Sequence, residues 1–234
     1  MHDQRFIHHQ NSKIITNIRE VVFGLEDGLV STLGAITGIA AGTGSHFTVI
    51  LAGLVIIAVE SISMGVGVFL ADASAKDIDD RKIDEEKFEI DNFLDKERAE
   101  LKGFYQHDGW PEKLAEQMSV AASQNKHLLL KEMLTRELKI FSQPTQSLKK
   151  GVVMFLAYIA GGLIPLLPYF FIPLPQATYL SVACTLAGLF ILGAGVGKLS
   201  LSNWFKHALK MLILGGLALS AGLLMSQLSQ KFIS

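Results

Sequence analysis

Four glutamates in the middle of this chain have a spacing that could bind metal ions. Glu86 and Glu89 form one Glu-x-x-Glu pair, and Glu97 and Glu100 form a second. At about 100° per residue on one continuous helix, all four side chains fall within an arc of roughly 80°. The same helix separates the two pairs by about 16 Å, so the spacing predicts that each pair serves its own ion.

A solvated helix face explains the same glutamates without any ion. Basic residues are interspersed among them, namely Lys82, Lys87, Lys96, Arg98 and Lys102. Like charges three residues apart nevertheless repel by a few tenths of a kcal/mol, and two such pairs on one side need some compensation. A bound cation is one form of compensation, and spacing alone leaves both interpretations open.

Two further acids, Asp27 and Glu60, lie inside long apolar segments. A charge near the middle of a bilayer costs at least about 2.5 kcal/mol when it is unpaired, so such residues have a functional reason. Met64 follows Glu60 by four residues and shares its helical face. A carboxylate beside a thioether suits Fe²⁺ or Mn²⁺ better than Mg²⁺ or Ca²⁺, which predicts a path for a divalent transition metal.

The elements that position these residues are predicted from hydropathy. Half of the 234 residues are hydrophobic, and the formal charge of −1 gives no indication of nucleic-acid binding. About 20 apolar residues span a hydrocarbon core, and five segments reach that length: 21–44, 47–70, 151–171, 177–197 and 207–228. A soluble protein with buried helices is the alternative, but the last three segments would overfill a small soluble core.

We therefore predict an all-α membrane protein with five transmembrane helices and a cytoplasmic helical metal-binding domain inserted between helices 2 and 3. Its predicted parts are a cytoplasmic N-terminal tail (1–20), transmembrane helices 1–2 (21–71), the cytoplasmic domain (72–148) and transmembrane helices 3–5 (149–234). Lysine and arginine are absent from the two short loops at 42–46 and 172–176 and abundant on the other side. This asymmetry predicts a cytoplasmic N-terminus.

The charged middle region begins with a predicted continuous helix from Asp72 to about Lys102, where no proline or glycine occurs. We expect Gly103 and the turn at 109–111 to break it, and two shorter helices to follow at 111–122 and about 125–140. Met133 and Glu137 share a face of the last helix, which makes them candidates to complete a site with the glutamates.

Glycines and prolines predict how the membrane helices pack. Gly24 and Gly28 are four residues apart, as are Gly34, Gly38 and Gly42. This spacing lets another helix approach closely, and a homodimer contact is one candidate use. Pro165 and Pro168 should bend or end the third span, because proline breaks the hydrogen bonding of the helix backbone.

The residues quoted so far resemble the vacuolar iron transporter family. The resemblance rests on the segment FGLEDGLVSTLG from Phe23 to Gly34, on the SMGVG turn that contains Met64, on the two Glu-x-x-Glu pairs with Met133 and Glu137, and on Pro165 to Pro168. It covers nearly the whole chain from about residue 19.

The resemblance implies a dimeric five-helix transporter that moves Fe²⁺, and often Mn²⁺, out of the cytosol in exchange for protons. It implies that Asp27 and Met64 line the translocation path. It also implies that a cytoplasmic domain gathers metal through Glu86, Glu89, Glu97, Glu100, Met133 and Glu137. Two positions depart from the family pattern: Ile56 and Leu134 stand where relatives commonly have an acid.

Together the residues predict a transporter in which Asp27 and Glu60 exchange protons for metal, with no prosthetic group and no enzymatic activity. A membrane-anchored metal sensor or scaffold without transport is the alternative. A di-iron oxidase is disfavoured because no histidine follows a glutamate by three residues. The expected location is a bacterial inner membrane, or alternatively a vacuolar membrane. His2, His8 and His9 could bind metal, although a short polar tail is more often disordered.

Overall fold

The computed structural model describes residues 17–140 and 146–233, which form two compact units. The spanning unit comprises the described residues up to Phe69 and from Ser147 onward, and the inserted unit comprises Leu70–Gln146. The N-terminal histidines and most of the predicted tail lie outside the described residues.

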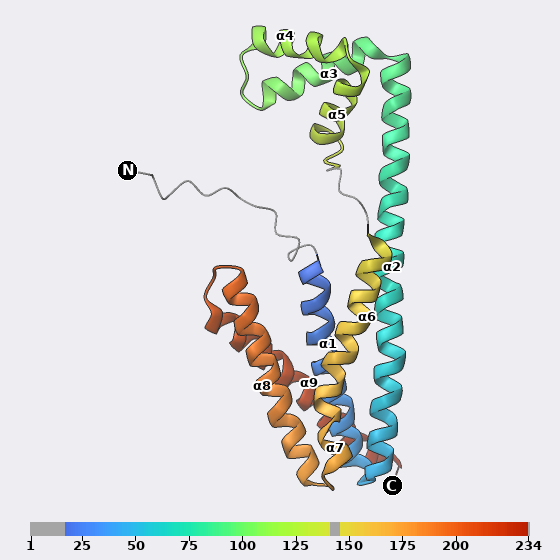
Figure 1. Ribbon diagram of the computed structural model, residues 1–234, viewed down its shortest axis with the longest axis vertical. Helices are drawn as coiled ribbons and strands as arrows, with labels where there is room; N and C mark the ends of the chain where they lie inside the picture. The colour runs from blue at the N-terminus through green and yellow to red at the C-terminus, as the bar shows by residue number, and fades with distance from the viewer. Residues whose placement is uncertain (1–16, 141–145, 234) are drawn as a thin grey trace, which may run out of the picture. The chain divides into compact units, whose positions relative to one another are not determined.

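The spanning unit contains the helices predicted to cross the membrane (Figure 1). They are α1 (Ile18–Thr43), the part of α2 (His46–Asn92) up to Phe69, α6 (Ser147–Leu166), α8 (Gln176–Leu199) and α9 (Trp204–Ile233), with the short α7 (Pro168–Phe171) after α6. In the described part of the chain, five helices are long and apolar enough to cross a membrane, as the hydropathy pattern predicts. Helix α6 ends at Leu166, just after Pro165, and Pro168 opens α7, which confirms the predicted effect of the two prolines.

Helix α1 lies against α6, α8 and α9 and organises the spanning unit. Its glycines make these contacts possible: a Cβ at Gly24 would lie only 2.8 Å from the Cβ of Ala157 on α6. Similarly, a Cβ at Gly34 would lie 2.9 Å from the backbone oxygen of Ala218 on α9. The predicted close packing is therefore confirmed, and these glycines serve it within one chain.

The inserted unit contains the last part of α2 followed by α3 (Leu94–His107), α4 (Glu112–Ser123) and α5 (Lys126–Arg136). Its core is formed by buried side chains that come from all four helices, namely Ile90, Leu101, Tyr105, Ala115, Ala122, Leu129 and Met133. The two short helices predicted at 111–122 and 125–140 correspond to α4 and α5.

The predicted continuous helix from Asp72 to Lys102 is wrong, because α2 ends at Asn92 and α3 begins at Leu94. Phe93 lies between them with φ −134° and ψ 36°, and its carbonyl accepts the N–H groups of Lys96 and Glu97. The Asn92 side chain donates to the Phe88 carbonyl, and Asp95 and Glu97 place negative charge in the first turn of α3. Acidic residues stabilise a helix N-terminus, so this sequence can start a new helix without proline or glycine. The predicted break at Gly103 is also wrong, since α3 continues through it.

Candidate metal centre

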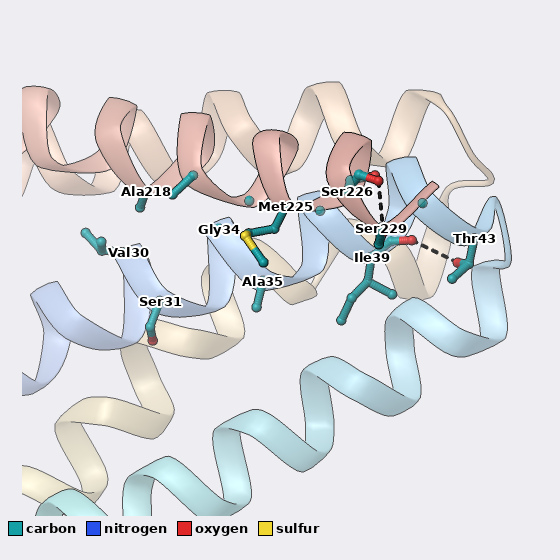
Figure 2. A pocket seen from close by; sticks show the side chains of 14 residues that line it. Val30, Ser31, Gly34, Ala35, Ile39, Thr43, Ala218, Met225, Ser226 and Ser229 are labelled. Atoms are coloured by element: carbon teal, nitrogen blue, oxygen red, sulfur yellow. Dashed lines mark hydrogen bonds between the residues drawn. The ribbon is translucent and has the colours of Figure 1, made fainter. Parts of the chain in front are cut away.

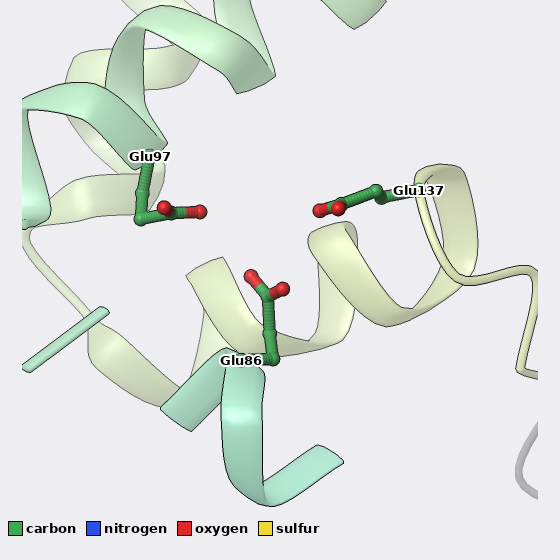
Figure 3. A group of neighbouring side chains, drawn as sticks. All are labelled: Glu86, Glu97 and Glu137. Atoms are coloured by element: carbon green, nitrogen blue, oxygen red, sulfur yellow. The ribbon is translucent and has the colours of Figure 1, made fainter. Parts of the chain in front are cut away.

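Three carboxylates converge in the inserted unit. Glu86 comes from α2, Glu97 from α3, and Glu137 directly follows α5, and each offers an oxygen within 4.8 Å of the others. Figure 3 shows the three side chains pointing toward a shared space. We call this set the glutamate trio.

Two members of the glutamate trio are buried and incompletely hydrogen-bonded. The exposed fraction is 2% for Glu86 and 5% for Glu97. Glu86 Oε1 and Glu97 Oε2 have no hydrogen-bond partner among the described residues. An unsatisfied buried carboxylate oxygen is costly, so these atoms favour the binding of a cation or a proton.

The electrostatics of the trio agree with that interpretation. Burial, and then repulsion by Glu137, Glu97 and Glu89, raise the pKa of Glu86 to about 8. Burial and neighbouring carboxylates also raise the pKa of Glu97 and the pKa of Glu137. Without metal Glu86 therefore retains a proton near neutral pH, and a divalent cation that binds there must displace it.

The turn at Phe93 corrects the predicted ion geometry. On a continuous helix Glu86 and Glu97 would be about 16.5 Å apart along the axis. Because α2 ends at Asn92 and a new helix starts at Leu94, one glutamate from each Glu-x-x-Glu pair enters the same cluster. The prediction that the pairs cannot share an ion is therefore wrong. Glu89 and Glu100, the second members, are exposed and act on the trio through their charges.

A polar clamp holds α5 where Glu137 can reach the other two carboxylates. Arg136 donates from Nε to Glu132 at 2.9 Å, forms a second ion pair with Asp108, and lies over the Tyr105 ring at 4.6 Å from its centroid. Tyr105 also donates from its hydroxyl to Glu132. This clamp was not predicted from the sequence, although Arg136 follows Glu132 by the four residues typical of helical ion pairs.

Met133 is fully buried in the core of the inserted unit. It lies one turn before Glu137, as the spacing predicts, and its sulfur remains a predicted ligand of the same site.

In the spanning unit, Asp27 and Glu60 lie within electrostatic reach of each other, from α1 and α2. Asp27 is half-buried and Glu60 is exposed, while Met64 is half-buried one turn later on α2. The two carboxylates predicted to work together are therefore close enough for the charge of one to affect the other. Neither is sealed off by packed side chains.

A groove of about 630 Å³ runs between α1 and α9 (Figure 2). It begins at Val30 and Ser31, one turn after Asp27, and extends to Thr43 at the end of α1. Met225 reaches from α9 toward α1 beside Gly34. The groove therefore connects the turn that carries Asp27 with the C-terminal end of α1.

The sequence pattern of the VIT family matches residues 18–227 of this chain. The chain belongs to the VIT family. This match runs from the start of α1 into α9 and includes the residues of both units. It confirms the resemblance inferred from the motifs.

Relatives in the VIT family match the chain over most of its length. Vacuolar iron transporter 1 of Tulipa gesneriana is 32% identical over 216 residues, which cover 92% of this chain and 87% of the relative. Vacuolar iron transporter 1 of Arabidopsis thaliana is 29% identical over 232 residues, covering 97% and 93% respectively. The vacuolar iron transporter of Toxoplasma gondii is 30% identical over 213 residues, covering 86% and 70%.

These VIT family relatives are named as transporters and not as enzymes. With its five candidate spans, the chain is accordingly a multi-pass membrane protein.

Proposed function

We propose that this protein exports Fe²⁺, and also Mn²⁺, from the cytosol across a membrane in exchange for protons. The observation that carries the proposal is the glutamate trio, in which Glu86 Oε1 and Glu97 Oε2 are buried without a hydrogen-bond partner among the described residues. The names of its relatives, which specify iron transport, support the choice of Fe²⁺.

In this proposal the inserted unit is cytoplasmic and gathers ions. The trio offers three carboxylates, and Glu89 and Glu100 add negative charge that attracts cations toward it. Oxygen ligands bind Fe²⁺ and Mn²⁺ in a labile way, whereas a tight Zn²⁺ site normally uses cysteine or histidine. Met133 would supply a sulfur ligand that favours transition metals.

Asp27, Glu60 and Met64 would form the membrane site of the transporter. A carboxylate in a dry site is neutralised either by a proton or by a metal ion. Metal from the cytosol would displace protons from Asp27 and Glu60, and protons from the other side would later displace the metal. The electrostatic reach between the two carboxylates supports a shared site.

We further propose that the protein acts as a homodimer. The Glu60 side chain is exposed on the surface of a single chain, in a segment that would otherwise face hydrocarbon. A charged side chain is too costly there, and a second copy that covers this face of α2 would remove the cost. A bacterial inner membrane or a vacuolar membrane, with the N-terminus in the cytosol, fits the distribution of positive charge.

Flux measurements on purified full-length protein in liposomes test the proposal. We expect Fe²⁺ and Mn²⁺ to cross, with slower Co²⁺ and Zn²⁺, and an internal pH dye to report proton movement in the opposite direction. Asp27→Asn and Glu60→Gln should abolish flux, whereas the exposed Glu85→Gln should not.

The outcomes separate the competing functions. Metal binding without flux of any ion would favour the sensor or scaffold. Metal flux that leaves the internal pH unchanged would exclude proton exchange but would still support metal transport.

A further inference from the structure

Tyr158 of α6 is connected to the turn of α1 that carries Asp27. Its side chain is fully buried, and its hydroxyl lies 2.6 Å from Ser31 Oγ. Ser31 Oγ in turn donates to the backbone carbonyl of Asp27 at 2.7 Å. A serine hydroxyl has one proton, which is already given to that carbonyl. The Tyr158 hydroxyl is therefore the donor to Ser31.

The position of Tyr158 is fixed by a close approach of two helices. Gly28 of α1 lies against the Tyr158 backbone, where a Cβ would overlap the Tyr158 carbonyl oxygen and lie 2.8 Å from Gly162 N. Gly161 of α6 faces Leu25 in the same way. Because backbone meets backbone here, the tyrosine side chain has little freedom to move relative to α1.

The Tyr158 hydroxyl also lies within electrostatic reach of the carboxylates of both Asp27 and Glu60. Its own proton is directed to Ser31 and not to either carboxylate.

We propose that Tyr158 is a positioning residue of the membrane site, which acts through Ser31 on the α1 turn that carries Asp27. The inference rests on the proposed function, since it assigns a role in the same transport site. A serine that bonds to the carbonyl four residues earlier bends a helix locally, so the Tyr158–Ser31 bond holds that bend in one conformation. That conformation fixes the point at which the Asp27 side chain leaves α1.

Loss of a partner that orients a metal ligand typically weakens metal affinity 10- to 100-fold. We therefore expect Tyr158→Phe to raise the KM for Fe²⁺ about tenfold, with Vmax changed less than about twofold. Ser31→Ala should have the same effect. The double variant should be no worse than either single variant, because both substitutions interrupt one connection.

Tyr169→Phe is the matched control. Tyr169 is another fully buried tyrosine of the spanning unit, and its hydroxyl donates to Thr178 Oγ1 at 3.1 Å. Tyr158→Phe and Tyr169→Phe each remove one buried hydroxyl bond, so both should lower the melting temperature similarly. Only the former should change KM and the ratio of Fe²⁺ to Mn²⁺ flux.

The liposome assay decides the matter. A wild-type KM in Tyr158→Phe or Ser31→Ala, an equal KM increase in Tyr169→Phe, or additive effects in the double variant would each overturn the inference. If Tyr158→Phe does not fold, Ser31→Ala alone decides. Wild-type protein without flux would overturn the proposed function together with this inference, whereas wild-type flux with unaffected variants would overturn the inference alone.

Discussion

Glu86 on α2 and Glu97 on α3 place carboxylate oxygens within 4.8 Å of each other, although a helix break separates them in sequence. Both are buried, and burial together with repulsion from neighbouring carboxylates raises the pKa of each. Such a pair is unfavourable without protons or a cation, and its properties lead to the first two predictions.

Glu86→Gln should weaken Mn²⁺ binding to the full-length protein at least about tenfold, because one of three carboxylates is lost. The same substitution should raise the melting temperature of the metal-free protein at neutral pH, since folding then no longer has to protonate a carboxyl that is ionised in the unfolded chain. Calorimetric titration and thermal unfolding measure the two effects. Glu85→Gln, an exposed neighbour that pairs with Arg81, should change neither. Weaker stability in metal-free Glu86→Gln would contradict this account of the trio.

Metal affinity and metal-free stability should depend on pH in opposite directions. The folded protein holds the pKa of Glu86 at about 8, above its ordinary 4.5. Between these values the folded state binds more protons than the unfolded state, so stability increases as pH falls from about 8 toward 4.5. Protons compete with Mn²⁺ at the same oxygens, so affinity should instead increase as pH rises from 6 to 8. Trp110 fluorescence in a Trp204→Phe background reports unfolding of the inserted unit, and a flat profile would contradict the raised pKa.

Phe93→Ala should weaken metal binding about tenfold by favouring continuation of α2 into α3. Phe93 contacts Phe88 edge-on and Lys96 through a cation–π contact, and alanine removes both while preferring helix. Phe88→Ala removes the same aromatic pair but leaves Phe93 between the two helices, so this variant should still bind metal. Equal losses in the two variants would show that the aromatic pair, not the helix break, matters.

Arg136→Met should destabilise the inserted unit by about 2 kcal/mol, with allowance for partial exposure, and also weaken metal binding. Arg136 directly precedes Glu137. It is held by ion pairs with Glu132 and Asp108 and by its contact with the Tyr105 ring. Arg81→Met removes only an exposed ion pair and should cost less than about 0.5 kcal/mol. Urea unfolding and calorimetry provide the comparison, and intact affinity in Arg136→Met would mean that Glu137 needs no clamp.

Gly28→Ala should abolish flux, since its Cβ would meet the backbone of α6 at Tyr158 and separate α1 from α6. Gly216→Ala on α9, where a Cβ meets nothing within 4 Å, should transport normally. The liposome assay compares the two, and normal flux in Gly28→Ala would show that the helices can shift without loss of the site.

The helices that span the membrane could be predicted because about 20 successive apolar residues leave few alternatives. Candidate ligands could be named from the sequence, since a carboxylate such as Asp27 stands out in an apolar segment, and their role in metal binding stays a prediction. The break at Phe93 could not, because it arises from the Asn92 side chain and acidic residues in the next turn rather than from proline or glycine. The role of Tyr158 could not be predicted either. No neighbouring residue in the sequence indicates it, because it depends on the contact between α6 and α1.

The glutamate trio brings together residues from α2, α3 and the end of α5, which are distant in sequence. A bound metal ion would therefore link these helices as a reversible crosslink. By mass action, each tenfold rise in free metal above the dissociation constant adds about 1.4 kcal/mol to the stability of the inserted unit. The lifetime of the protein in the cell would then depend on the concentration of free metal. Degradation by proteases would be slower when metal is abundant and faster when metal is scarce.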